Sequence, residues 1–228
     1  MERIQIKLKD NKKAYFAGDF HLGIPDEKSS ILREKKIINW LDSIEKNTQE
    51  LFLMGDIFDF WFEYKTVVPK GFVRVLGKLA EISDSGIPVT FFVGNHDFWM
   101  RDYFKEELGI SVHRQTHTIT IGGSRFFIGH GDGLGPKDNG YKLMKKLFIN
   151  PLVRWLFKWI HPDLGIRLGQ YLSLKNKLIS GEENLKFLCE KNESLVAYSK
   201  IKLREKAPVK LIPLINLKIK SKYAPVYL

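Results

Sequence analysis

Leu51-Phe52-Leu53-Met54-Gly55-Asp56 is the stretch that decides the fold: an apolar run that ends in glycine and is followed by a carboxylate. The same order, an apolar run, glycine and then polar side chains, returns in segments 14–21, 90–97 and 125–132. A continuous apolar run that stops at glycine is typical of a buried strand in a parallel sheet. We therefore expect strands in all of these segments, each delivering polar side chains just beyond its carboxyl end.

These polar side chains form a set of metal-type ligands. Because the carboxyl ends of parallel strands meet in one crevice of an open α/β sheet, we expect the side chains to converge. Their mixture of carboxylate, amide and imidazole donors suits Mn²⁺, Fe or Zn²⁺ better than Ca²⁺, and predicts a site for two divalent ions. Asp56, in the most central run, is the natural bridging carboxylate for such a pair. The expected ligands are Asp19, His21, Asp56, Asn95 and His130.

Further polar residues accompany these ligands. His96 follows Asn95 at the mouth of the expected site, where we expect it to contact a substrate phosphate or to protonate a leaving oxygen. Asp97 is expected to orient His96, and Asp59 and Asp132 are expected to hold ligands by hydrogen bonds. Any one of these residues alone would more often be a polar group without function; the repeated pattern favours the metal site.

The segments between the runs predict helices. Residues 30–41 and 72–82 carry apolar side chains at helical spacing, and a turn at 85–88 follows the second segment. Strand, helix and strand in alternation predict βαβ units and hence an α/β fold with a largely parallel sheet. Residues 118–121 and 125–128, separated by two glycines at the centre, predict a hairpin added to that sheet.

The character of the chain changes at Gly140, where an inserted helical lid over about 140–182 is predicted. Pro151 suits the first turn of a helix, and His161-Pro162 should end it. On this stretch alone, a core helix with buried tryptophans is favoured, but basic residues interleaved with aromatic ones favour an amphipathic surface that meets lipid or acyl chains. The residues expected to meet substrate are Lys142, Lys145, Leu152, Trp155 and Trp159.

Composition and charge limit the possible partners. Cys189 is the single cysteine among 228 residues, so an intrachain disulfide is excluded and a reducing cytoplasm is expected. Neither a signal peptide nor a membrane span is expected. The net charge of +11 is concentrated in segments 140–180 and 200–228, which predicts an anionic membrane surface or substrate. No nucleic acid is expected, because the basic residues lie among Leu and Trp instead of in a reading motif.

The site motifs resemble those of the calcineurin-like metallophosphoesterases, and more closely those of the UDP-2,3-diacylglucosamine hydrolases of lipid A biosynthesis. The motifs are Asp-x-His at 19–21, Gly-Asp-x-x-Asp at 55–59, Gly-Asn-His-Asp at 94–97 and Gly-His-Gly-Asp at 129–132. The closer resemblance rests on segments 55–61 and 130–134 and on the aromatic and basic helices that follow. The resemblance covers about residues 12–200.

This resemblance implies a single domain of layered α/β/β/α architecture over residues 1–228, with the lid inserted. It implies a Mn²⁺-dependent enzyme, peripheral at the cytoplasmic face of the membrane, that hydrolyses UDP-2,3-diacylglucosamine to UMP and 2,3-diacylglucosamine 1-phosphate. Asp19, His21 and Asp56 would bind one ion, and Asp56, Asn95 and His130 the other. The lid would cover the acyl chains. His96 stands where many of these hydrolases carry Arg.

One motif of the resembling family is missing. The family carries Gly-His-x-His late in the chain, whereas this sequence has no histidine after His161 and ends in an atypical basic tail over about 205–228. Two explanations are open: an altered end of the chain, which the basic composition favours, or a divergent member that uses other ligands. Weakened metal binding and reduced activity are therefore expected. The alternatives are another calcineurin-like phosphoesterase and an inactive membrane-associated remnant.

Overall fold

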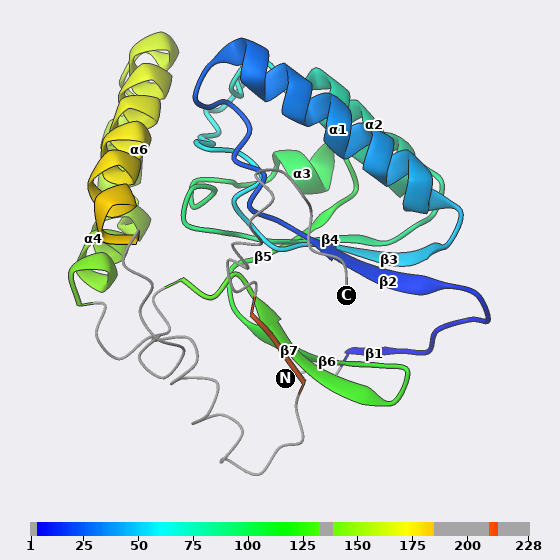
Figure 1. Cartoon of the computed structure of the whole chain (residues 1–228). Helices are drawn as coiled ribbons and strands as arrows, with labels where there is room; N and C mark the ends of the chain where they lie inside the picture. Colours follow the sequence, from blue (N-terminus) through cyan, green and yellow to red (C-terminus); the bar gives the residue numbers. More distant parts are fainter. Residues whose placement is uncertain (1–3, 133–138, 185–209, 214–228) are drawn as a thin grey trace.

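The computed structural model describes residues 4–132, 139–184 and 210–213 and contains two stacked four-stranded sheets (Figure 1). The first sheet is parallel throughout and has the order β2-β3-β4-β5. Its strands are β2 (Lys13–Ala17), β3 (Thr48–Leu53), β4 (Val89–Phe92) and β5 (Ser111–His113). The first three of these strands lie in the predicted runs, and their parallel pairing confirms that part of the prediction.

Helices α1 (Glu27–Glu45) and α2 (Val73–Asp84) cover the outer face of this first sheet (Figure 1). Both predicted helices are confirmed. Asp26 is the N-cap of helix α1, and its carboxylate accepts a hydrogen bond from the Ser29 amide at 2.8 Å. A short helix, α3 (Tyr103–Glu106), follows the loop after β4.

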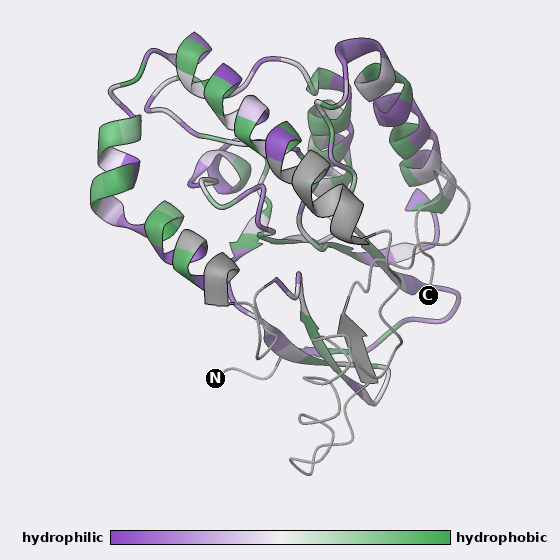
Figure 2. Cartoon of the chain, turned by 60° about the vertical axis from the view of Figure 1, so that its left-hand side comes forward, coloured by the Kyte–Doolittle hydropathy of each residue, from purple (hydrophilic) through white to green (hydrophobic). Residues whose placement is uncertain are grey.

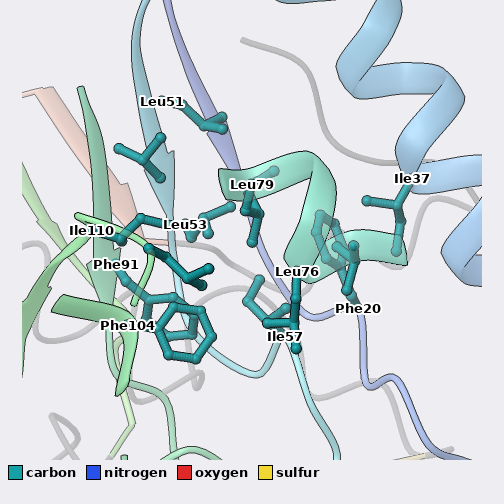
Figure 3. Close-up of a cluster of buried hydrophobic side chains, with 14 of the residues drawn as sticks. Phe20, Ile37, Leu51, Leu53, Ile57, Leu76, Leu79, Phe91, Phe104 and Ile110 are labelled. Carbon is teal, nitrogen blue, oxygen red and sulfur yellow. The ribbon is translucent and has the colours of Figure 1, made fainter. Parts of the chain in front are cut away.

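The main core lies between these helices and the first sheet. Figure 3 shows Leu76 and Leu79 of α2 and Ile37 of α1 facing the sheet, where they meet Leu51, Leu53 and other buried side chains. Burial of each such Leu or Ile side chain stabilises the fold by about 1.5–3 kcal/mol. The core therefore fixes the strands whose carboxyl ends carry the polar residues.

The second core lies between the two sheets. Alternate residues of β3 and the residue after it, Phe52 and Met54, point away from the helices. They meet Ile119, Ile121 and Ile128 of the second sheet. A strand that packs on both faces must be apolar at every position, which is the physical reason for the continuous run at 51–54.

The second sheet has the order β1-β6-β7-β8. Its strands are β1 (Ile4–Ile6), β6 (His117–Ile121), β7 (Ser124–Gly129) and β8 (Lys210–Pro213). The predicted hairpin exists as β6 and β7, with Gly122 and Gly123 at positive φ in its turn. However, the prediction that it extends the parallel sheet was wrong, because β6 and β7 belong to a separate sheet. Strand β7, the fourth run, pairs antiparallel with β6 and parallel with β8.

A helical insertion connects β7 to β8 in the sequence. It contains α4 (Asn139–Ile149), α5 (Pro151–Phe157) and α6 (Pro162–Asn184), which stand beside the sheets (Figures 1 and 2). Pro151 is in the first turn of α5, as predicted, and the Asn150 side chain caps it at the Leu152 amide. The prediction that His161-Pro162 ends this helix was wrong. Helix α5 ends at Phe157 through tight i→i+3 bonds, and Pro162 begins α6.

The basic tail and the single cysteine lie largely outside the described residues. Of the basic tail, only the four residues of β8 lie within the described residues, and Cys189 lies outside them. No described helix is long and apolar enough to cross a membrane.

Candidate metal centre

Four loops bring the predicted ligands together around Asp56. Asp19 and His21 follow β2, Asp56 follows β3, Asn95 follows β4 and His130 follows β7. The Oδ2 atom of Asp56 lies 3.4 Å from His130 Nε2 and 3.8 Å from His21 Nε2. Asp56 is buried, with 4% of its surface exposed. The cluster therefore stands at the edge where the parallel strands end.

The ligand-type atoms fall into two groups that share Asp56. In one group, atoms of Asp19, Asp56 and His130 lie within 4.8 Å of one another, and in the other, atoms of His21, Asp56 and His96 do. This sharing is what a bridging carboxylate between two ions requires. The division differs from the one that the resemblance implied, because Asp19 and His21 belong to different groups and His96 completes one of them.

Asn95 joins the group of Asp19 and His130. Its Oδ1 lies 3.2 Å from His130 Nε2. An amide oxygen and an imidazole nitrogen that approach the same point supply one hard and one borderline donor to a divalent ion. The predicted ligands are therefore all gathered in one place, although no metal ion is part of the structure.

The backbone is strained at three of these residues. Asp19, His21 and Asp56 have φ values of 54°, 44° and 52°, in the left-handed region that residues with a Cβ rarely adopt. Backbone hydrogen bonds hold them there: the Asp19 amide donates to Gly55 O and the His21 amide to Asp56 O, at 3.0 and 2.9 Å. Each such conformation costs of the order of 1–3 kcal/mol and is characteristic of functional sites. The strain therefore points to the same cluster as the donor atoms.

Two glycines are required by the close approach of the loops. A Cβ on Gly94 would lie 2.2 Å from Asp56 Oδ1, and a Cβ on Gly55 would lie 2.6 Å from the Gly94 amide nitrogen and 2.8 Å from His130 Nδ1. Gly55 also has a φ of 89°. Any larger residue at either position would push Asp56 or His130 away from the centre, which explains why glycine precedes these polar residues in the sequence.

Backbone carbonyl groups orient two of the imidazoles. His130 Nδ1 lies 2.8 Å from Met54 O, and His96 Nδ1 lies 2.7 Å from Asp59 O. A carbonyl oxygen can only accept, so both Nδ1 atoms carry the proton and both Nε2 atoms point toward Asp56. Metal-bound histidines are commonly held in this way, with the second nitrogen fixed by a hydrogen bond. The arrangement fits a metal site on its chemistry.

Opposite charges shift the pKa values of Asp56 and His130 apart. Burial alone would raise the pKa of Asp56, but His130, His96 and His21 outweigh it and hold the pKa well below its usual range. Burial would lower the pKa of His130, but Asp56, with help from Asp19 and Asp132, raises this pKa to about 10. In the metal-free chain, a protonated His130 thus compensates a charged Asp56.

His96 and Asp97 differ in their surroundings from what the sequence suggested. Burial lowers the pKa of His96, so its ring is neutral at pH 7. The contacts that hold this ring come from Asp59 O and from Ser173 on α6, not from Asp97. Asp97 is fully buried, and its Oδ1 accepts from the Phe58 amide at 3.4 Å. Burial raises the pKa of Asp97 well above its usual range, and the side chain fastens the loop that follows β3.

Asp59 and Asp132 both contact other members of the site. Asp59 is buried, and its Oδ1 lies 3.5 Å from His21 Nδ1. Asp132 binds Lys145 of α4 at 2.5 Å, and the Lys145 ammonium also lies over the Phe98 ring. Lys145, which was expected to meet substrate, therefore pairs with Asp132, whose negative charge also helps to raise the pKa of His130.

Helix α5 and the turn that follows it expose the face that was expected to meet acyl chains. Leu152, Trp155 and Trp159 are 62%, 53% and 76% exposed, so the interpretation as a core helix with buried tryptophans is wrong. The residue that packs inward is Phe157, whose ring lies 4.5 Å from Trp99 and 4.6 Å from Phe62. Among the described residues of the insertion, exposed large apolar ones include Leu143, Leu147, Ile149, Leu152, Trp155, Leu156, Trp159, Leu164, Leu168, Tyr171, Leu172 and Leu174.

The remaining predicted contact residue, Lys142, is half-buried on α4. Arg154 on α5 is also half-buried, and burial lowers its pKa. The sequence reasoning did not single out Ser173, which is buried on α6 beside His96. The spacing of Gly165, Gly169 and Ser173 at every fourth residue was the available signal, because it places small residues on one helix face.

The fold, the strained loops and the shared carboxylate together indicate a metal-binding site of the kind that phosphoesterases use. A family model for calcineurin-like phosphoesterases matches residues 12–199, and the chain belongs to this family. The fold class predicted from the motifs is thereby confirmed.

Within this family, the chain is similar in sequence to two proteins that share one name. Over 172 residues, the chain is 42% identical to the UDP-2,3-diacylglucosamine hydrolase of Porphyromonas gingivalis, covering 75% of this chain and 65% of that protein. Over 162 residues, it is 26% identical to the enzyme of the same name from Yersinia pseudotuberculosis, covering 71% of this chain and 65% of that protein. The chain thus spans slightly less than two thirds of the length of these relatives. A solved structure of a protein of unknown function from Aquifex aeolicus aligns with 59% of this chain and 71% of its own at a TM-score of 0.36 and 17% identity.

Proposed function

We propose that this chain is a metal-dependent hydrolase that cleaves the pyrophosphate bond of UDP-2,3-diacylglucosamine, giving UMP and 2,3-diacylglucosamine 1-phosphate. The assignment as a metal-dependent hydrolase rests on Asp56, which two groups of ligand atoms share. Within each group the atoms lie within 4.8 Å of one another. The substrate rests on the 42% identity to a relative that bears this enzyme's name. The step belongs to lipid A biosynthesis.

The proposed ligands are Asp19, His21, Asp56, Asn95 and His130, with Asp56 between two ions. Mixed oxygen and nitrogen donors suit Mn²⁺, which we propose as the native metal. When bound, the ions supply Lewis-acid activation of water and neutralise charge on the phosphoryl group. The carbonyls of Met54 and Asp59 support this role, because they keep the Nε2 atoms of His130 and His96 turned toward Asp56.

We propose two alternative roles for His96, as a metal ligand or as a group that contacts the substrate. Measuring metal affinity by titration would distinguish them, because only a ligand contributes to that affinity. Its Nε2 lies 3.9 Å from Asp56 Oδ2 and is unprotonated when the ring is neutral, which suits a ligand for the ion bound by His21. In the alternative role, the same atom would carry a proton and would contact the substrate phosphate or give that proton to the leaving oxygen. Asp97 supports the loop that carries Asp56, and Asp59 and Asp132 hold other residues of the site.

The helical insertion is proposed to act as a lid over residues 140–182 of a single domain. Its exposed apolar residues suit the two acyl chains of the substrate or the acyl region of a membrane, and its Lys and Arg residues suit an anionic surface. A peripheral position at the cytoplasmic face of the membrane follows from this proposal. An exposed apolar area of this kind is characteristic of an interaction surface.

The absent Gly-His-x-His motif leads us to propose weak metal binding for this chain. Strand β8 pairs parallel with β7 so that Pro213 lies beside Gly129, the residue before His130. The strand next to the centre therefore reads Lys-Leu-Ile-Pro and supplies no imidazole. Two further histidines at this place would tighten the binding of both ions, since loss of even a supporting partner costs about 10–100-fold in affinity.

The test is UMP release from UDP-2,3-diacylglucosamine by the purified chain, loaded with Mn²⁺ and compared with a His130→Ala variant. Release that the substitution abolishes supports substrate and site together. Cleavage of bis-p-nitrophenyl phosphate without UMP release would instead indicate another phosphoesterase of this family. Binding to anionic vesicles with no turnover of either substrate would indicate an inactive membrane-associated remnant. The exposed apolar surface of the insertion suits this alternative as well.

A further inference from the structure

Ser173 is a buried polar residue on an otherwise exposed part of helix α6. Its side chain is 7% exposed, whereas its neighbours Leu172 and Leu174 are 41% and 37% exposed. The Ser173 hydroxyl oxygen lies 3.3 Å from His96 Nδ1. Helix α6 thus reaches the metal centre where Ser173 contacts His96.

The close approach of α6 depends on two glycines one and two turns before Ser173. A Cβ on Gly169 would lie 2.3 Å from the Phe60 ring, and a Cβ on Gly165 would lie 2.2 Å from the Tyr64 hydroxyl. Residues four apart lie on the same helix face, so these glycines and Ser173 all face the body of the protein. The glycines let the helix backbone come near enough for a short serine side chain to touch His96.

The hydrogen bonds at His96 assign the role of each partner. Asp59 O can only accept, so the proton lies on Nδ1 and is donated over 2.7 Å. The Ser173 oxygen at 3.3 Å is a second, longer acceptor of the same proton. Two acceptors at the Nδ1–H group restrict rotation of the ring, and thereby fix the direction of Nε2 toward Asp56.

We propose that Ser173 is a positioning residue for His96, so that docking of the lid helix α6 sets the orientation of the imidazole at the metal centre. This proposal rests on the proposed function only for its kinetic consequence, since the geometry concerns the chain alone. Displacement of α6 removes one acceptor and lets the ring turn. The position of helix α6 and the orientation of the His96 ring are therefore coupled through the Ser173 hydroxyl group.

The first test is NMR of the ¹⁵N-histidine-labelled full chain in the presence of Mg²⁺, with the His96 signals assigned by their loss in His96→Gln. In the wild type, a single tautomer with the proton on Nδ1 and slow exchange of that proton is expected. Ser173→Ala should speed this exchange about three- to tenfold, as loss of a weak hydrogen bond predicts. Leu174→Ala is the matched control and should leave the signals unchanged. Unchanged His96 signals in Ser173→Ala would overturn the proposal.

The second test is a double-mutant cycle on UMP release. Ser173→Ala should lower kcat about three- to tenfold at unchanged KM. It should have no further effect in a His96→Gln background, because the serine acts through His96. A rise in KM alone, or an equal loss in both backgrounds, would show that Ser173 serves lid structure or substrate binding and would overturn the proposal. If the chain releases no UMP at all, the proposed function fails while the NMR result still decides the positioning role.

A third variant pair tests the docking of α6. Gly169→Ala forces the helix away from Phe60 and should reproduce the NMR change of Ser173→Ala. Adding Phe60→Leu removes the ring atoms that the new Cβ would meet, and the double variant should recover the wild-type His96 signals. Wild-type signals in Gly169→Ala alone, or no recovery in the double variant, would contradict the coupling between α6 and His96.

Discussion

His130 Nε2 lies 3.4 Å from Asp56 Oδ2, while the other nitrogen of the same ring is bound to Met54 O at 2.8 Å. The backbone carbonyl fixes the ring and turns Nε2 toward Asp56 Oδ2 and Asn95 Oδ1. In the metal-free chain Nε2 carries a proton, and the ion pair with Asp56 raises the pKa of His130 to about 10. A metal ion that takes this place must first displace the proton.

Proton release on metal binding follows from this pair. Because His130 is protonated below pH 10 in the metal-free chain, binding of Mn²⁺ at pH 8 should release about one proton from it. The apparent affinity should rise about tenfold per pH unit below pH 10. Calorimetric titration in two buffers of different ionisation enthalpy measures the release. Equal binding enthalpies in both buffers would refute this expectation.

The stability of the metal-free chain should also depend on His130. A base whose pKa is raised on folding contributes stability that is complete below its unfolded pKa and is lost as pH rises through the folded value. For His130 this window runs from pH 6.5 to about 10. Urea unfolding should show a falling free energy of unfolding across this window. In His130→Gln this contribution should be missing; an identical slope in both proteins would assign it to other groups.

Asp56→Asn should remove metal binding at both positions. The carboxylate belongs to both ligand groups, and an amide carries no charge with which to bridge two cations. Metal analysis after gel filtration in Mn²⁺ should find no bound ion, whereas loss of one outer ligand, as in His21→Gln, should spare part of the content. Asp102→Asn is the control, because the Asp102 side chain is 65% exposed. Retention of a stoichiometric ion by Asp56→Asn would exclude the bridging role.

The strands and the convergence of the ligands were predictable because both follow from local pattern. A continuous apolar run such as 51–54 has to be buried on both faces, and the carboxyl ends of parallel strands necessarily meet. The sheet to which the hairpin β6–β7 belongs was not predictable, since its pairing with β1 depends on partners more than a hundred residues away. The left-handed backbone at Asp19, His21 and Asp56 was equally hidden, because none of these residues is glycine.

The partners of His96 show the same limit within the site. Sequence places Asp97 next to His96, yet the atoms that hold the ring come from Asp59 O and Ser173. A backbone carbonyl leaves no mark on the sequence. Helical periodicity likewise identified the apolar face of α5 but could not tell a buried face from an exposed one, which only tertiary packing decides.

Helix α5 allows stability and surface binding to be separated by a matched set of substitutions. Trp155 and Trp159 are 53% and 76% exposed, and their ring centroids lie 5.9 Å apart. Phe157, between them in sequence, instead packs on Phe62 and Trp99. Replacing the tryptophans should leave the free energy of unfolding within about 0.5 kcal/mol, whereas Phe157→Ala should lower it by about 1–3 kcal/mol, less than for a fully buried ring.

Sedimentation with vesicles that contain anionic lipid should give the reverse order. The Trp155→Ala/Trp159→Ala variant should bind less, because large aromatic side chains supply the apolar area that enters the acyl boundary. Phe157→Ala should bind as the wild type does at temperatures where it remains folded. High salt should weaken binding of all three proteins, since Lys and Arg of the insertion attract the anionic surface. Undiminished binding of the double tryptophan variant would show that Trp155 and Trp159 do not contact the membrane. The proposed contact of these residues with the acyl chains of the substrate would then remain to explain their exposure.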